Sequence, residues 1–433
     1  MKKIIVLAYQ ISPFRGSEYS VAWNYVTEMS KDNELVVLYG ASGNHMGDFD
    51  DFEKNLKFNG IKNVLFLAIK PNIFARTINV LNKKDWFSYA FYFAYRIWHL
   101  QAYNIALQLT KNEKFDLIHF LNPIGYREPG YLWKINIPYM WGPISGTVNR
   151  PILLFKGLST KEKVFFQIRN WINTLQFIHN SRLKNALLRT DLLLTATTEN
   201  QKKIQDYYNK SSIYFPENGI VNSSILFPSR KINLDSNDII NILWIGSIDA
   251  RKSLIILLDA LAMLNINNWK LHVIGDGPKK ISMQNIAKQV QIENNVVWHG
   301  QITREDVFNL LQLGHLNVIS SLGEGNPTTI WEAMANGIPT IALNHCGMKD
   351  VICEKCGIRI DISSYDQVIN DIADVLSDLL ENPNKINILS EGVNECIGNF
   401  TWEMRRKLFN QFYNTAIENW KQKNETIYYA RQQ

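Results

Sequence analysis

The chain has 433 residues, of which 46% are hydrophobic, 12% aromatic and 20% charged, so it is long and apolar enough to bury a large core and is not mainly disordered. Its four cysteines are too few for a disulfide scaffold and fit a reducing compartment. No apolar run reaches the ~18 residues of a membrane span, so we predict a cytoplasmic protein. The length of the chain predicts two or three domains.

The net charge of +6 is divided unevenly along the chain. Residues 1–218 carry 27 Lys and Arg against 17 Asp and Glu, whereas residues 219–433 carry 19 against 23. A basic first half favours an anionic partner, either a phosphorylated substrate or an anionic membrane surface; a solvated surface without a partner is the alternative. No zinc-finger spacing, RNA-recognition signature or Lys/Arg-dense run occurs, so we predict no nucleic-acid partner.

Short apolar runs alternate with longer helical patterns along the whole chain. The first run, 4–8, follows two lysines as in a signal peptide, but it is too short, and we interpret it as a strand. The predicted strands are 4–8, 35–39, 64–69, 117–121, 138–141, 192–196, 242–246, 271–275, 296–300, 316–320, 339–343 and 357–360. This alternation is the βαβ pattern of a parallel sheet, and it occurs twice.

A turn-rich stretch at 215–219 marks the predicted boundary between two α/β domains. We predict a first domain at 1–218, a second domain at 219–401, and a long amphipathic helix at 402–433 that returns to the first domain. Ligands of open α/β sheets bind at the carboxyl ends of the strands. The site is therefore expected where these edges of the two sheets face each other across a cleft.

Residues 85–109 are unusually rich in aromatic side chains. One interpretation is a surface that meets lipid or an apolar acceptor, with Lys83, Lys84 and Arg96 supplying charge. The other is a helix of the first domain's core. Residues 164–178 pose the same question.

The most informative segment contains Glu324 and Glu332. Asn326 is a predicted N-cap, Pro327 the first residue of a helix, and Gly337 its C-terminal cap. The N–H groups of the first helical turn form an anion site. A diphosphate bound there would have one carboxylate on each side.

A second element follows the strand at 242–246. Arg251 and Lys252 lie where a helix is predicted to begin, and cations are unfavourable there unless they bind an anion. A bound diphosphate would explain both residues; the alternative is that both point into solvent.

These segments resemble the retaining glycosyltransferases of family four, which have the two-domain GT-B fold. The strongest match is the Glu-x7-Glu pattern of Glu324 and Glu332. The family's EAMA-x-G-x-P pattern is met at 332–339, and further matches lie at 273–278, 218–220 and 402–403. The resemblance covers most of the chain.

The resemblance implies a nucleotide-sugar donor bound mainly by the second domain and an acceptor bound by the first. Glu324 would contact the sugar, Glu332 the ribose, and Lys252 with Arg251 the diphosphate. The sugar would be transferred with retention of anomeric configuration, with no metal ion and no cofactor. Apart from the resemblance, the basic and aromatic first domain favours a lipid-linked or anionic glycan acceptor, such as an intermediate of a surface polysaccharide. We therefore expect the protein to work in the cytoplasm with contact to the inner face of the membrane.

The remaining site residues follow from the same resemblance. The residues implied on the donor side are Gly325, Asn326, Pro327, Thr328, Thr329, Gly246, Ser247, Gly300, Gln301, Ile302, Gly16 and Ser17. The residues implied on the acceptor side are Arg15, Glu18 and Asn122.

Three positions depart from the family pattern. Ser247 stands where the family usually has Arg, and Arg251 is the candidate replacement for its charge. Ser17 follows Gly16 where the family often has a second glycine. Leu121 replaces the second histidine of a His-x-His motif, so His119 is either a catalytic residue or a structural one.

Two short motifs are typical of metal sites, but we predict no metal at either. Asp48 and Asp50 form an Asp-x-Asp within a loop-like acidic run. Cys353 and Cys356 form a Cys-x2-Cys, but a zinc site needs a second pair, for which Cys346 and Cys396 are the only candidates.

Two alternatives to a glycosyltransferase are kept open. One is another enzyme of the same fold, such as a sugar-nucleotide epimerase or a phosphorylase. The other is a catalytically silent nucleotide-binding partner, which the departures at Ser247 and Leu121 keep open.

Overall fold

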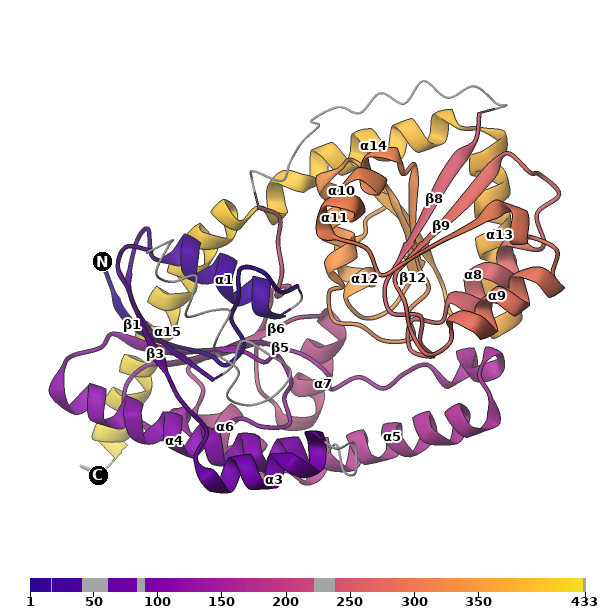
Figure 1. Cartoon of the computed structure of the whole chain (residues 1–433). Helices are drawn as coiled ribbons and strands as arrows, with labels where there is room; N and C mark the ends of the chain where they lie inside the picture. The colour runs from indigo at the N-terminus through magenta and orange to yellow at the C-terminus, as the bar shows by residue number, and fades with distance from the viewer. Residues whose placement is uncertain (17, 41–60, 84–89, 222–237, 431–433) are drawn as a thin grey trace. The chain divides into compact units, whose positions relative to one another are not determined.

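The computed structural model describes residues 1–16, 18–40, 61–83, 90–221 and 238–430 (Figure 1). The chain forms two compact units. The first unit comprises Met1–Thr147, Leu175–Gly219 and Trp402–Gln433, and the second comprises Val148–Thr174 and Ile220–Thr401. Asp48 and Asp50 lie outside the described residues.

The first unit is built on a seven-stranded sheet in the order β3-β2-β1-β4-β5-β6-β7, and every pairing in it is parallel. Its strands are nearly continuous apolar runs, as expected for a parallel sheet covered on both faces. The strands are β1 (Lys3–Ala8), β2 (Glu34–Tyr39), β3 (Val64–Ala68), β4 (Leu117–Asn122), β5 (Tyr139–Ile144), β6 (Leu192–Thr195) and β7 (Ile213–Tyr214). The six strands predicted in this half are confirmed, and β7 is an addition.

The second unit contains a six-stranded parallel sheet in the order β10-β9-β8-β11-β12-β13, which confirms the other six predicted strands. Its strands are β8 (Ile240–Ile245), β9 (Trp269–Ile274), β10 (Val296–Gly300), β11 (Leu316–Ile319), β12 (Thr340–Leu343) and β13 (Gly357–Ile360). The strand order reverses between β8 and β11, and in the first sheet between β1 and β4. Such reversals are where doubly wound sheets bind ligands.

Helices cover both sheets. Those that lie wholly in the first unit are α1 (Glu18–Met29), α3 (Ile73–Lys83), α4 (Ala90–Asn112), α6 (Ser181–Arg189), α7 (Thr198–Tyr208) and α15 (Trp402–Ala430). Those of the second are α8 (Leu254–Leu261), α9 (Lys280–Gln289), α10 (Arg304–Leu313), α11 (Thr328–Ala335), α12 (Cys346–Val351), α13 (Tyr365–Glu381) and α14 (Asn384–Ile397). Helix α5 (Thr160–His179) begins in the second unit and ends in the first.

The segment 148–174 belongs to the second unit because its apolar side chains are buried there. Leu154 and Phe155, from the short 3-10 helix η2 (Ile152–Gly157), belong to the core cluster that also contains Trp244 of β8 and Tyr365 of α13. Burial of large apolar side chains of this kind typically contributes about 1.5–3 kcal/mol each.

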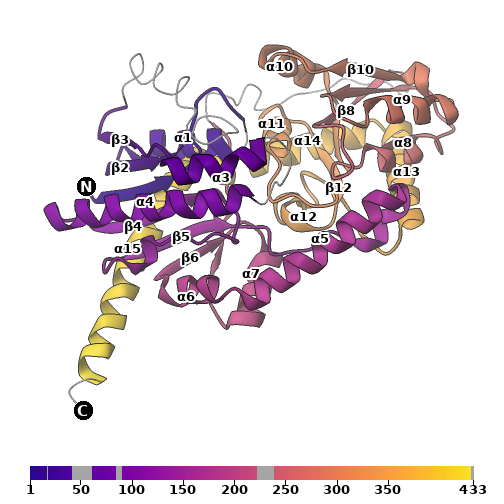
Figure 2. The same ribbon diagram turned by 60° about the horizontal axis from the view of Figure 1, so that its bottom comes forward.

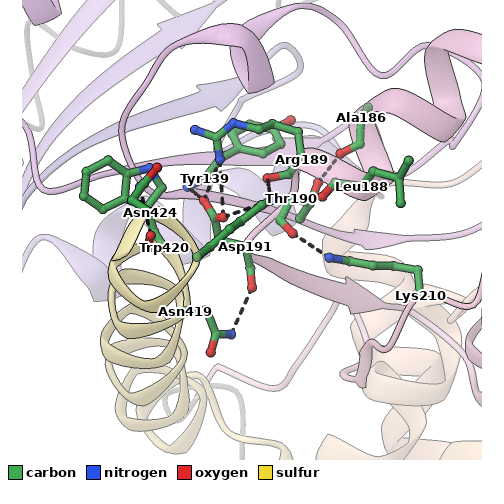
Figure 3. Close-up of polar contacts among 11 residues, drawn as sticks. Tyr139, Ala186, Leu188, Arg189, Thr190, Asp191, Lys210, Asn419, Trp420 and Asn424 are labelled. Carbon is green, nitrogen blue, oxygen red and sulfur yellow. Dashed lines mark hydrogen bonds and ion pairs between the residues drawn. The ribbon is translucent and has the colours of Figure 1, made fainter. Parts of the chain in front are cut away.

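The C-terminal helix returns to the first unit, as predicted, and packs against α1. Its C-terminal half is held by a polar cluster around Asp191, the residue before β6 (Figure 3). The amide of Asn419 donates to the Asp191 carbonyl (3.0 Å), while the Asp191 carboxylate accepts the Tyr139 backbone N–H (2.9 Å) and pairs with Arg189 (3.2 Å). Asp191 therefore joins α15, β5 and β6.

The aromatic segment divides between core and surface. Helices α3 and α4 lie side by side (Figure 2), and α4 buries Tyr95 and Trp98 against Tyr9, whereas Phe93 of the same helix is 53% exposed. The core interpretation is therefore right for one face of α4. Trp86, Phe87 and Tyr89 lie outside the described residues. No helix in the described part of the chain is long and apolar enough to cross a membrane.

Candidate functional site

The loops that follow β8 and β11 are tied together at the reversal point of the second sheet. The Leu322 N–H donates to the Arg251 carbonyl (2.8 Å), and the Ser320 hydroxyl donates to the Lys252 carbonyl (3.0 Å). Ser320 in turn accepts the indole N–H of Trp244 (3.1 Å). These bonds fix the backbone of one loop relative to the other, which is the support that a preorganised site requires.

Three of the predicted site residues meet on these loops. Glu324 lies 2.7 Å from the Nζ atom of Lys252 and also pairs with Arg251. The side chains of Lys252 and Glu324 are only 12% and 10% exposed, whereas that of Arg251 is 35% exposed. Asp249 accepts the backbone N–H groups of Arg251 and Lys252 (2.8 and 2.9 Å) and so shapes the turn that carries both cations. The two cations therefore do not simply point into solvent.

Arg150 is a further cation beside this cluster. Its guanidinium carbon lies 4.1 Å from the centroid of the Phe166 ring, and its Nη1 atom is buried with no hydrogen-bond partner. Burial lowers the pKa of Arg150 to about 9, with Arg169 and Arg251 adding to the effect and Asp249 and Glu324 opposing it. The residue is thus a cation at neutral pH that interacts electrostatically with the Arg251 and Glu324 charges.

The helix after Glu324 begins one residue later than predicted. α11 starts at Thr328, and Pro327 is the N-cap with φ −61° and ψ 135°, without a side-chain cap bond. The predicted N-cap role of Asn326 and helical role of Pro327 are therefore wrong, because the proline ring holds a φ that also suits the extended residue before a helix. The N–H groups of Thr328 and Thr329 still belong to the first turn.

The C-terminal end of α11 matches the prediction. Gly337 has φ 68°, its N–H donates to Met334, and the next N–H, of Ile338, donates to Ala333 (3.0 and 2.9 Å). This is a Schellman motif, for which glycine is the favoured residue.

The glycine loop before α11 is packed closely against α12. A Cβ atom on Gly347 would lie 1.7 Å from the carbonyl oxygen of Gly325, so only glycine fits there. His345 donates from Nε2 to the Ser321 carbonyl (3.1 Å) on the same side. The loop that carries Glu324 and Gly325 is therefore supported by α12 as well as by the loop after β8.

Glu332 has different surroundings from Glu324. Its side chain is 30% exposed and lies 4.0 Å from Arg304 of α10. Burial raises the pKa of the Glu332 carboxyl, and the charge of Arg304 opposes this shift. The two predicted carboxylates therefore lie on one segment but have separate cationic partners.

Three strand ends form the remaining edge. Gly275 donates to the Gly300 carbonyl (2.9 Å), and a Cβ on Gly275 would lie 2.0 Å from the Gly246 carbonyl oxygen. The structure thus brings Gly246 close to Gly275, and Gly275 to Gly300. The residues that follow differ in their surroundings: Ser247 and Gln301 are exposed, whereas Ile302 packs against the core beside Ile338.

The predicted residues of the first unit lie at its own reversal point. The Asn122 amide donates to the carbonyls of Gln10 (2.7 Å) and Glu18 (3.0 Å), so it ties the loop after β1 to the end of β4. Arg15 lies over the Tyr19 ring (5.8 Å). Gly16 is exposed, a Cβ there would meet nothing, and Ser17 lies outside the described residues. Burial raises the pKa of Glu18 to about 7, and the negative charge of Glu217 adds to the shift.

His119 is fully buried under α1 and α15. Its Nε2 donates to the Gly142 carbonyl (2.8 Å), and its Nδ1 lies 2.9 Å from the Tyr25 hydroxyl and 3.2 Å from the Tyr413 hydroxyl, which also bond to each other. Burial lowers its pKa to about 4, so the ring is neutral at physiological pH. This environment favours the structural interpretation of His119, and its catalytic role stays an untested prediction.

Residues 228–390 match the family model of the glycosyl transferases group 1. This segment of the chain is similar to that family. The match includes Lys252, Glu324 and Glu332 and lies in the second unit. Among curated relatives, an uncharacterized glycosyltransferase of Haemophilus influenzae is 26% identical over 197 residues, which are 43% of this chain and 54% of the relative. The chain spans about half the length of these curated relatives.

Solved structures extend the likeness to nearly the whole chain. The apo form of the lipopolysaccharide outer core galactosyltransferase WaaB is similar with a TM-score of 0.62 and 18% identity, over 95% of this chain and 98% of that chain. Anabaena Alr3699/HepE in complex with UDP and glucose is similar with a TM-score of 0.59 and 14% identity, over 96% of this chain and 100% of that chain. At these identities the likeness concerns the fold alone, and it confirms the predicted GT-B fold of this chain.

Proposed function

We propose that this chain transfers a sugar from a nucleotide-sugar donor to a glycan or lipid-linked glycan acceptor, with retention of anomeric configuration. The observation that carries the proposal is the contact of Glu324 with Lys252 and Arg251, on the loop that leads into α11 at Thr328. Fixed cations and the free N–H groups of a helix N-terminus are groups that bind a diphosphate.

The cations stabilise the leaving group. When the bond from the sugar C1 to the diphosphate oxygen breaks, negative charge builds on the β-phosphate. Lys252, Arg251 and the N–H groups of Thr328 and Thr329 are held in place before that charge appears, and this is the usual source of electrostatic catalysis. With these groups supplying the charge, no divalent metal ion is needed for the transfer.

Arg150 supplies the charge that Ser247 lacks. Its buried Nη1 has no partner, and its guanidinium interacts with the charges of Arg251 and Glu324. Sequence reasoning missed this residue because it stands in no motif and because its segment joins the second unit only through packing.

Glu324 acts as a positioning group in this scheme. Its carboxylate holds Lys252 and Arg251 and accepts hydrogen bonds from the sugar hydroxyls. The acceptor oxygen bonds to C1 on the face that the diphosphate leaves, and its proton passes to the departing phosphate oxygen. Glu332 accepts a hydrogen bond from the ribose, and the strand end at Gly300, Gln301 and Ile302 borders the base.

The acceptor binds to the first unit, near Arg15, Glu18 and Asn122. WaaB is named for a lipopolysaccharide outer core, and Alr3699/HepE was solved with UDP and glucose. These names support a UDP-sugar donor and a surface polysaccharide acceptor. We propose that the protein acts at the cytoplasmic face of the membrane.

Helix α5 carries the surface that fits a membrane contact. Phe165, Ile168 and Trp171 are 61%, 52% and 64% exposed, and the basic Lys161, Lys163 and Arg169 share the helix. An apolar face bordered by cations binds anionic lipid surfaces. Co-sedimentation with anionic liposomes should fall for a Phe165→Ser, Trp171→Ser variant and not for Leu188→Ser, which changes an equally exposed leucine of α6. Equal binding by all three proteins would remove this part of the proposal.

The donor site is tested by thermal shift with UDP, GDP, ADP and their common sugar conjugates. A ligand at about 100 times its dissociation constant adds roughly 2.7 kcal/mol of stability. One nucleotide should stabilise the wild type and not Glu332→Ala, while Lys288→Ala, an exposed change on α9, should behave as wild type. No shift with any nucleotide would count against the proposal.

Turnover separates the remaining alternatives. Transfer to an acceptor without added Mg²⁺ or Mn²⁺ supports the proposal. Donor consumption without an acceptor indicates an epimerase, dependence on inorganic phosphate indicates a phosphorylase, and binding without turnover indicates a silent partner.

A further inference from the structure

Three cysteine thiols meet in the second unit, away from the charged cluster around Glu324. The Sγ atom of Cys353 lies 3.4 Å from that of Cys356 and 3.4 Å from that of Cys396. The three sulfur atoms all lie within 4.8 Å of one another. Sequence analysis named Cys346 and Cys396 as the only candidates for a second pair but predicted no metal, because the sequence does not show that Cys396 reaches this turn.

The fold holds these thiols with tight backbone packing. Cys353 and Cys356 flank the turn between α12 and β13, and Cys396 lies in the last turn of α14. A Cβ on Gly392 would lie 1.8 Å from the Lys355 carbonyl oxygen, so α14 touches the backbone of this turn directly. The convergence of the thiols therefore does not depend on long flexible side chains.

The turn itself has features of a metal-binding loop. The backbone N–H of Cys353 donates to the Cys356 sulfur (3.2 Å), and such bonds stabilise sulfur in its anionic form. Lys355, which lies in this turn, is paired with Glu395 of α14 (2.9 Å), so its charge is balanced.

A metal ion bound by these thiols would displace their protons, since a coordinating thiol is deprotonated outright.

We propose that Cys353, Cys356 and Cys396 together bind one Zn²⁺ ion, with water as the fourth ligand. Tetrahedral zinc with Zn–S bonds of about 2.3 Å places its sulfur ligands about 3.8 Å apart. The two separations of 3.4 Å from Cys353 need to open by only a few tenths of an ångström, and the third lies within 4.8 Å. Thiolates select soft and borderline ions such as zinc over magnesium or calcium. No fourth His, Cys, Asp or Glu joins the group in the described part of the chain, which is why water completes it.

The consequence for the unit is structural. Cys356 is part of the core cluster that also contains Trp331 of α11 and Val393 of α14, and Cys353 and Cys396 pack against it. Zinc would join the turn before β13 to α14 and thereby stiffen the packing behind α11. The inference does not depend on the proposed transfer reaction.

Metal content of the full chain, purified under reducing conditions with zinc in the medium, tests the inference. We expect one zinc per chain for the wild type and for Cys346→Ser, and loss of zinc for Cys353→Ser and Cys396→Ser. Cys346 is the matched control because it is the one cysteine outside the cluster. Circular dichroism of each variant shows whether it is folded.

Cobalt gives a second readout on the wild type alone. Co²⁺ bound to thiolates produces an intense sulfur-to-metal charge-transfer band, which added Zn²⁺ should abolish. A folded wild type without zinc and without this band would overturn the inference. So would a disulfide between two of the three cysteines in the protein isolated under reducing conditions, detected by denaturing mass spectrometry.

Discussion

The Nζ atom of Lys252 lies 2.7 Å from a carboxylate oxygen of Glu324. The two residues come together because β8 and β11 are neighbours in the second sheet and the strand order reverses between them. Each loop leaves its strand at the same edge, and bonds from Ser320 and Leu322 join the loops. The pair fixes the position of a cation at the point where a doubly wound sheet binds its ligand.

Replacing Lys252 by Ala should weaken binding of the nucleoside diphosphate by about 10- to 100-fold. A hydrogen bond to a charged group typically contributes about 1.5–3 kcal/mol, and tenfold corresponds to about 1.4 kcal/mol. Isothermal titration of wild type, Lys252→Ala and the control Lys288→Ala measures the effect. Unchanged affinity in Lys252→Ala would show that Lys252 does not meet the diphosphate.

Arg150 should contribute to the same affinity through its position beside the cluster. Arg150→Ala should weaken diphosphate binding by about tenfold. Adding Ser247→Arg to this variant should restore part of the loss, because the strand-end position is exposed and lies in the loop before Arg251. A loss that Ser247→Arg does not reduce would indicate that Arg150 acts through packing on Phe166 and not through its charge.

The strands were predictable because each one is a short apolar run bounded by turn residues. Such runs are typical of buried strands, since most helices are longer. β7 has only two residues, too few for a periodic signal. The cluster of Arg251, Lys252 and Glu324 could be expected from the motifs, since all three follow strand ends.

Other features depended on contacts between residues far apart in the sequence. Arg150 reaches the site because Leu154 and Phe155 are buried in the second unit. His119 is enclosed because α15 returns and places Tyr413 beside it. No local pattern contains these contacts, and a local rule also failed where Pro327 took the N-cap in place of Asn326.

The contact between Gly347 and the Gly325 carbonyl should make the glycine loop sensitive to a single methyl group. In Gly347→Ala the Cβ would start 1.7 Å from that oxygen, so the loop or α12 must move. We expect lower thermal stability and weaker nucleotide binding. Gly398→Ala is the control, since a Cβ there meets nothing and its φ of −59° suits alanine. If the two variants bind nucleotide equally well, the loop position is not critical.

Stability should fall as the pH is lowered from 6.5 toward 4. Burial lowers the pKa of both His99 and His119 to about 4, from 6.5 in the unfolded chain, so the unfolded state binds more protons in this window. Protonation of each histidine lowers the free energy of unfolding by at most about 3 kcal/mol. Glu18 has the opposite effect, because its pKa of about 7 in the folded state exceeds the unfolded value of 4.5. Its buried charge destabilises the folded state, and protonation on acidification removes that destabilisation.

Glu18→Gln separates these contributions. The variant should be more stable than wild type above pH 7 and should lose stability more steeply below pH 6.5, because the opposing group is gone. Urea unfolding across this range measures both slopes, with the exposed Glu293→Gln as the control. Parallel profiles for wild type and Glu18→Gln would contradict the assignment.

Asp191 should be a stability determinant of the first unit because it joins β5, β6 and α15 (Figure 3). In Asp191→Ala the buried N–H of Tyr139 loses its acceptor, which costs about 1–3 kcal/mol. Asp191→Asn keeps an acceptor oxygen and should lose less, the more so since burial raises the pKa of Asp191 and its charge is not favoured there. Asp206→Ala, an exposed change on α7, should have little effect in chemical denaturation. Equal losses in the Ala and Asn variants would mean that the ion pairs with Arg189 and Lys423, and not the bond to Tyr139, hold this junction together.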